Sequence, residues 1–127
     1  MTNYSGDYAL SPEEIKQLVV QALDSDKAED IEVITLPAQT SIADYMVVAS
    51  GRSTRQVVAL AEKLKIRLNL EGIEDVKIEG TEQGDWVIVD AGDIIIHLFR
   101  PEVREYYGIE KMWSLNQPIE FRDSFTQ

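Results

Sequence analysis

Two stretches of the chain repeat apolar residues at the spacing of an amphipathic α-helix. The first opens with Ser11 as N-cap, Pro12 at the first helical position and Glu14 as the partner of a capping box. The second opens with Ser53 and Gln56, which form the same capping pattern after a glycine turn. The apolar stripes that follow comprise Ile15, Leu18, Val19, Ala22 and Leu23 in the first stretch and Val57, Leu60, Ala61, Leu64 and Leu68 in the second. The patterns predict one helix that ends near residue 24 and another that stops before residue 72.

Three shorter stretches have the composition of β-strands. In residues 30–36, side chains for the two faces of a strand alternate, with Ile31, Val33 and Thr35 on one face and Glu32, Ile34 and Leu36 on the other. Pro37 follows and would end the strand. Residues 45–50 form a compact run rich in valine between Asp44 and Gly51, which favours a largely buried strand. Residues 76–79 predict a weak third strand, followed by a polar turn over residues 80–84.

Residues 84–99 indicate two further strands joined by a two-residue hairpin turn at Ala91-Gly92. The pairs expected on one face are Trp86 with His97, Ile88 with Ile95, and Asp90 with Asp93. The other face carries only Val87, Val89, Ile94, Ile96 and Leu98, and we expect it to be core. A bulge at Gly92 would instead set the two valines beside Asp93 and His97. The purely aliphatic face favours the simple turn.

After the hairpin, Pro101 can open a short helix over residues 102–107 that Gly108 ends. The sequence from Asn116 onward is polar and lacks periodicity, so no element is expected there. A helix joins the second strand to a later one, which predicts a parallel pair with a right-handed crossover. The expected fold is a single α/β domain with a mixed, mainly five-stranded sheet and flanking helices. We expect a flexible N-terminus over residues 1–10, a domain over 11–114 and a tail over 115–127.

The charge of the chain indicates which kind of partner it can bind. The 127 residues include 23 acidic and 12 basic side chains, which gives a formal net charge of −11. This charge opposes association with nucleic acid and makes a basic surface the better partner. The chain has no cysteine and no apolar run of membrane-spanning length, so we expect a cytoplasmic protein without thiolate metal sites, disulfides or membrane contact.

Two features could carry enzyme chemistry. The turn Gly51–Ser53 precedes a helix N-terminus that could hold a phosphate, and Asp90 with Asp93 could hold magnesium. Together they suggest a divergent nucleotidyltransferase-like enzyme, but no Asp-x-Asp pair follows the turn. A helix cap and turn-forming aspartates explain the same residues. His97, the only histidine, has no evident nucleophile beside it, so we expect no catalytic residue, metal site or cofactor.

Several short motifs occur in a specific order along most of the chain. In chain order they are Asp44-Tyr45-Met46-Val47-Val48-Ala49-Ser50-Gly51 with Ser53, Arg55, Gln56 and Val57; Glu79-Gly80; Gly84, Trp86, Val87, Val89 and Asp90; Gly92-Asp93; His97 and Phe99; and Arg104-Glu105-Tyr106-Tyr107 with Trp113. This combination resembles the ribosomal silencing factor family, also called Iojap, from about residue 10 to 114. The chain departs from the family pattern mainly at Ala91, where an aromatic residue is common.

The resemblance implies a binding protein and not an enzyme. Members of this family bind a ribosomal protein on the intersubunit face of the large ribosomal subunit, which blocks the small subunit from joining and represses translation under nutrient limitation. It also implies a fold related to nucleotidyltransferases without the catalytic site, a homodimer when free, and little direct contact with nucleic acid. The partner-binding residues we predict are Trp86, Ile88, Asp90, Asp93, His97, Tyr106, Tyr107 and Trp113.

Overall fold

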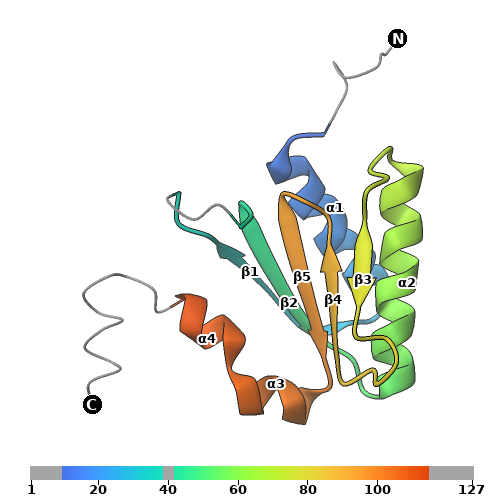
Figure 1. The fold of residues 1–127 in the computed structure, drawn as a ribbon, viewed down its shortest axis with the longest axis vertical. Helices are drawn as coiled ribbons and strands as arrows, with labels where there is room; N and C mark the ends of the chain where they lie inside the picture. Colours follow the sequence, from blue (N-terminus) through green and yellow to red (C-terminus); the bar gives the residue numbers. More distant parts are fainter. Residues whose placement is uncertain (1–9, 39–41, 115–127) are drawn as a thin grey trace.

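The computed structural model describes residues 10–38 and 42–114, which form a five-stranded mixed sheet with helices on both faces (Figure 1). The strands lie in the order β1 (Glu29–Thr35), β2 (Tyr45–Ser50), β5 (Ile94–Phe99), β4 (Trp86–Asp90) and β3 (Lys77–Glu79). The pair of β2 and β5 is parallel and the other pairs are antiparallel. The predicted α/β class, the five strands and the parallel pair are therefore confirmed. Within these residues, no helix is long and apolar enough to cross a membrane.

Helices α1 (Pro12–Ser25) and α2 (Thr54–Leu70) cover one face of the sheet (Figure 1). Both predicted capping residues, Ser11 and Ser53, are confirmed, because their hydroxyls accept backbone N–H groups of the first helical turns. The capping box of α1 is complete, with the Glu14 carboxylate accepting the Ser11 N–H at 2.9 Å. At α2 the predicted box is only half formed, since the Gln56 side chain accepts the N–H of Arg52 at 2.7 Å instead.

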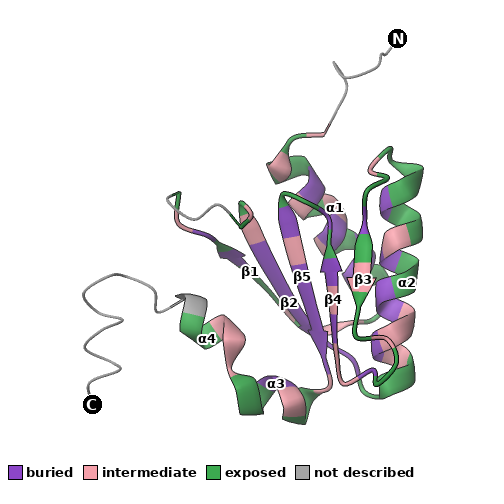
Figure 2. Ribbon diagram, in the orientation of Figure 1, coloured by how far each residue is buried: buried purple, intermediate pink, exposed green. Residues whose placement is uncertain are grey.

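The core has one layer on each face of the sheet (Figure 2). Between the sheet and α1 and α2 lie the aliphatic residues that the sequence predicted as core, Val87, Val89, Ile94, Ile96 and Leu98. On the opposite face a smaller cluster contains Ile34, Leu36, Met46, Val48 and Phe99. Helices α3 (Pro101–Tyr107) and α4 (Ile109–Ser114) lie over this second face through Val103 and Ile109. The sheet is therefore covered only in part on its second face.

Helix α4 was not predicted from the sequence. Gly108 adopts the left-handed conformation that ends α3, as its position suggested, at φ 58°. Its carbonyl then accepts the N–H groups of Lys111 and Met112, so a second helix begins at once. A helix of 6 residues is too short to show an apolar period.

The hairpin register differs from the predicted one by two residues. Asp90 pairs with Ile95 and Ile88 with His97, while Trp86 lies opposite Phe99. The turn is formed by Gly92 and Asp93, so neither the Ala91-Gly92 turn nor a bulge at Gly92 occurs. A shift of two residues leaves every side chain on its predicted face, because side chains alternate with a period of two.

The turn geometry explains this register. Gly92 has φ +86°, and across it the Asp93 N–H donates to the Ala91 carbonyl at 3.1 Å, as in a γ-turn that favours glycine. The Asp90 carboxylate accepts the Gly92 N–H at 2.9 Å. The Asp93 carbonyl accepts the N–H groups of residues 44 and 45, which ties the turn to the start of β2.

Candidate functional site

Trp86, the first residue of β4, joins three elements on the partly covered face of the sheet. Its indole Nε1–H donates to Nδ1 of His97 on β5 at 3.0 Å. Its ring stacks on Phe99 with centroids 5.0 Å apart and contacts Tyr107 of α3 with centroids 4.7 Å apart. Trp86 is half-buried, so part of the indole remains open to solvent. The large aromatic is thus fixed in place and yet accessible, as an interface anchor must be.

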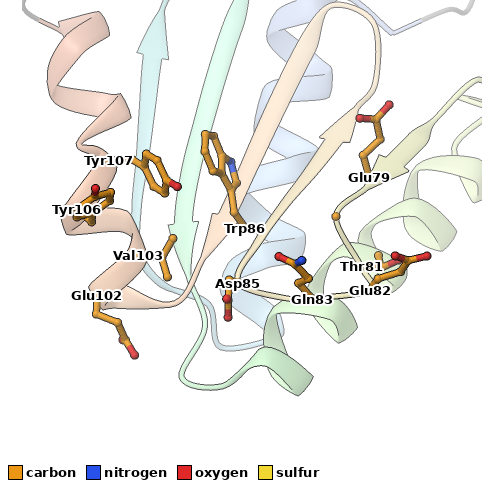
Figure 3. A pocket seen from close by; sticks show the side chains of 11 residues that line it. Glu79, Thr81, Glu82, Gln83, Asp85, Trp86, Glu102, Val103, Tyr106 and Tyr107 are labelled. Carbon is orange, nitrogen blue, oxygen red and sulfur yellow. The ribbon is translucent and has the colours of Figure 1, made fainter.

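A cleft of about 820 Å³ lies beside this tryptophan, between α3 and the connection from β3 to β4 (Figure 3). Its lining residues are Glu79, Gly80, Thr81, Glu82, Gln83, Asp85, Trp86, Glu102, Val103, Tyr106 and Tyr107. Tyr106 and Tyr107 contact each other edge to face with centroids 4.9 Å apart, and they are 81% and 51% exposed. The cleft therefore presents apolar area on one wall and polar groups on the other.

The charged groups of the cleft are acidic. Glu79, Glu82, Asp85 and Glu102 line it, and no basic side chain of the described residues does. Arg100 forms ion pairs with Asp85 at 3.0 Å and Glu102 at 2.6 Å. Within the described part of the chain, Glu79 and Glu82 form no ion pair. Four carboxylates against one guanidinium leave an excess of negative charge at the cleft.

His97 lies beneath Trp86 and is only 6% exposed. Burial lowers the pKa of its imidazole from 6.5 to about 4, because removal from water disfavours the charged form. The ring is therefore neutral near pH 7. Since Nδ1 accepts the tryptophan N–H, the imidazole proton is assigned to Nε2.

Helix α3 is attached to the sheet through Arg104, which is 7% exposed. Its guanidinium pairs with Glu110 of α4 at 2.9 Å and donates to the hydroxyl of Ser50, at the end of β2, at 2.8 Å. This largely buried pair, together with the bond to Ser50, holds both short helices against the sheet. It thereby places Tyr106 and Tyr107, which follow it closely along α3, at the cleft.

The structure brings together part of the predicted partner-binding set. Trp86, His97, Tyr106 and Tyr107 lie in one site, although the sequence treated the strand residues and the tyrosines as separate candidates. Ile88 lies two residues further along β4 and is partly exposed. Trp113 belongs to α4, but its side chain lies outside what the structure describes.

Asp90 and Asp93 lie at the far end of the hairpin, and Asp90 is roughly 14 Å along β4 from Trp86 at about 3.4 Å per residue. Asp90 forms the turn through its bond to the Gly92 N–H, which is the structural role that the sequence left open. Both aspartates are exposed, and their place in a binding site stays a prediction. The acidic groups adjacent to the tryptophan are different ones.

Sequence reasoning missed these carboxylates, Glu79, Glu82, Asp85 and Glu102. Three of them flank or lie within the stretch that was interpreted only as a polar turn before Trp86. Acidic residues shortly before a tryptophan were the available signal. The fourth, on α3, could be placed there only by the packing of α3 over the sheet.

The two features of the enzyme alternative lie at opposite ends of the sheet. Ser50, next to the Gly51–Ser53 turn, pairs with Phe99, whereas the Asp93 turn lies beside Tyr45. Six residues of strand separate these ends, about 17–20 Å at the usual rise. The phosphate-binding turn and the aspartates therefore cannot contact one phosphate and its metal. Among the residues described, no cluster of three or more His, Asp or Glu side chains suits a metal ion.

Comparison with known proteins finds relatives over most of the chain. The family model described as "Ribosomal silencing factor during starvation" matches residues 9–127. The chain is 51% identical over 115 residues to ribosomal silencing factor RsfS of Zymomonas mobilis, covering 87% of this chain and 86% of that protein. It is 41% identical over 113 residues to mitochondrial assembly of ribosomal large subunit protein 1 of Mus musculus, covering 87% of this chain and 48% of that protein. A crystal structure of a protein from Chromobacterium violaceum has a TM-score of 0.79 and 41% identity, covering 86% of this chain and 91% of that one.

Proposed function

The chain belongs to the ribosomal silencing factor family, and from this premise we propose that it is a translational repressor that binds the large ribosomal subunit. Its partner is a basic ribosomal protein on the intersubunit face. Binding there blocks the small subunit from joining and represses translation under nutrient limitation. The protein acts sterically in the cytoplasm and catalyses no reaction.

The observation that carries this proposal is the acidic, aromatic cleft at Trp86 (Figure 3). Interfaces concentrate binding energy in large aromatic residues that become fully desolvated, and Trp86 and Tyr107 are arranged for that. The surrounding carboxylates complement lysine and arginine side chains and repel phosphate. A basic protein therefore fits the cleft better than ribosomal RNA does.

Charge reversal at the cleft tests this assignment. Glu82→Lys places a positive charge where the partner's positive charge is proposed to lie, and Glu74→Lys makes the same change at an exposed site outside the cleft. We expect Glu82→Lys to weaken cosedimentation with purified large subunits about tenfold or more, and Glu74→Lys to have a much smaller effect. Equal losses for the two variants would show that only net charge matters and would remove the cleft from the interface.

Steric blocking of subunit joining predicts a specific result in a reconstituted translation system. The protein should inhibit initiation without consuming nucleotide, and excess small subunits should partly reverse the inhibition. Inhibition that requires hydrolysis, or that persists on joined ribosomes that do not dissociate, would contradict steric blocking. A magnesium-dependent rise in melting temperature with a nucleoside triphosphate would instead support the nucleotidyltransferase-like alternative.

The remaining expectations from the resemblance are part of the same proposal. The free protein forms a homodimer, which light scattering after gel filtration measures directly. The expected domain over residues 11–114 contains every residue of the proposed partner-binding set. A variant that lacks 115–127 should then cosediment with large subunits as well as the full chain does.

A further inference from the structure

The hydrogen bond between Trp86 and His97 crosses the hairpin diagonally. Trp86 pairs with Phe99 in the sheet register, and His97 pairs with Ile88, so the two rings meet from non-opposed positions. The Nε1 to Nδ1 distance is 3.0 Å and the ring centroids are 5.9 Å apart with an interplanar angle of 43°. The bond therefore depends on one orientation of each ring.

His97 offers almost no surface to a partner. It is 6% exposed, and its ring also stacks on Phe99 with centroids 6.1 Å apart at an interplanar angle of 15°. Phe99 itself is fully buried, which leaves the imidazole little freedom to turn. A docking protein would touch Trp86 and the tyrosines, but it would meet His97 only through them.

We propose that His97 is a positioning residue whose Nδ1 holds the Trp86 indole as the wall of the acidic cleft. Its significance for ribosome binding rests on the proposed function, whereas the positioning itself does not. The bond fixes the indole, whose ring also contacts Phe99 and Tyr107, at a place where it lines the cleft. Without the acceptor, the half-buried N–H would turn toward water and the cleft wall would be lost.

Holding the indole in place reduces the conformational entropy that the Trp86 side chain loses on binding. An aromatic side chain that is already fixed in its bound orientation loses little freedom when a partner covers it. A freely rotating indole would have to be ordered at that moment. His97 therefore raises affinity without contributing a contact of its own.

Nuclear magnetic resonance on the full chain tests the positioning directly. The chain has two tryptophans, so the indole N–H of Trp113 serves as an internal reference for that of Trp86. We compare His97→Leu, which removes the acceptor, with His97→Asn, whose side-chain oxygen can take the place of Nδ1. In the unaltered protein and in His97→Asn the Trp86 indole N–H should exchange slowly with solvent. In His97→Leu its exchange should rise at least about tenfold, as expected for the loss of one hydrogen bond, while Trp113 is unchanged.

Cosedimentation with large subunits measures the consequence for binding. His97→Leu should bind about tenfold more weakly, and His97→Asn should recover most of the loss. Trp86→Phe removes the donor from the other side. It should therefore weaken binding and, combined with His97→Leu, add little further effect.

The outcomes are separable. Slow indole exchange in His97→Leu, or additive effects of the two substitutions, would overturn the positioning role. If His97→Leu does not fold, fast Trp86 exchange in a folded His97→Asn with undiminished binding would overturn it equally. Failure of the unaltered protein to bind large subunits would refute the proposed function, and the exchange measurement would still decide the role of His97.

Discussion

Trp86 takes part in the packing of the sheet and also lines the cleft that we propose as the binding site. Its N–H donates to His97 and its ring stacks on Phe99, and the partly exposed indole also lines the cleft. These contacts fix the ring that lines the cleft. This dual role also explains the lone histidine, which the sequence presented as a possible partner contact. The described geometry makes it a buried, neutral acceptor.

The stability of the protein should depend on pH because of His97. Because its folded pKa is lowered to about 4 from 6.5, the unfolded chain binds a proton between these values and the folded chain does not. The contribution of His97 to the free energy of unfolding should therefore be complete above pH 6.5 and should be lost as the pH falls toward 4. This loss amounts to about 3 kcal/mol at most. Chemical denaturation across this range measures the fall. His97→Asn, which cannot titrate, should show a shallower slope, and an identical slope would contradict the lowered pKa.

At the scale of elements, the cleft depends on the close approach of two strands. Gly80, which directly follows β3, has φ +93°, and a Cβ there would overlap the carbonyl oxygen of Trp86. Only glycine permits this approach, which sets the tryptophan against the connection that forms the polar wall.

Gly72 and Gly80 have the same φ, so substitutions at the two positions distinguish the cost of backbone strain from the cost of a steric overlap. Gly72 also has φ +93°, but a Cβ added there would have nothing within 4 Å. Gly72→Ala should destabilise the protein by about 1–2 kcal/mol, from the unfavourable φ alone. Gly80→Ala should cost several kcal/mol, on the order of a disruptive core change, because the backbone at Trp86 must also move. Thermal or chemical unfolding measures both, and similar losses would mean that the two strands can separate without penalty.

Arg104 is the link that attaches α3 and α4 to the sheet. Arg104→Ala would leave Glu110, whose side chain is 15% exposed, without its partner, and the loss of one partner from a buried pair costs up to about 3–5 kcal/mol. We expect this loss in chemical denaturation. A double replacement by apolar residues, Arg104→Met with Glu110→Leu, should recover much of it, since the unpaired charge is then gone. If the double variant is no more stable than Arg104→Ala, the pair acts through geometry that apolar packing cannot replace.

For the molecule as a whole, we expect the net charge of −11 and the aromatic cleft to make different contributions to the proposed binding. Acidic side chains speed the encounter with a basic partner, and this attraction weakens as salt screens it. Apolar contact at Trp86 does not weaken in the same way. Affinity for large subunits should therefore decline as salt rises from about 50 to about 300 mM, on the order of tenfold, but persist above that range. Indifference to salt would exclude a role for the charge, and complete loss at moderate salt would exclude the aromatic anchor.

The sequence determined the elements other than α4 and the two faces of the hairpin strands. Helix caps at Ser11 and Ser53 and apolar stripes are local signals, and the alternation in residues 86–99 separated the core face from the face that holds Trp86 and His97. These signals depend on the periods of the helix and the strand, which neighbouring residues alone establish. The motifs also indicated the family, since they are spread along most of the chain.

Only the tertiary structure decided the register of the hairpin and the composition of the site. The register depends on the γ-turn at Gly92 and on bonds from the Asp93 carbonyl to residues 44 and 45, which lie far away in the sequence. The cleft combines a strand, its preceding connection and α3, so its carboxylates become neighbours only when α3 packs over the sheet. A local pattern fixes which way a side chain points along its own strand. Which distant side chains it meets depends on long-range packing, and it is this packing that forms the cleft.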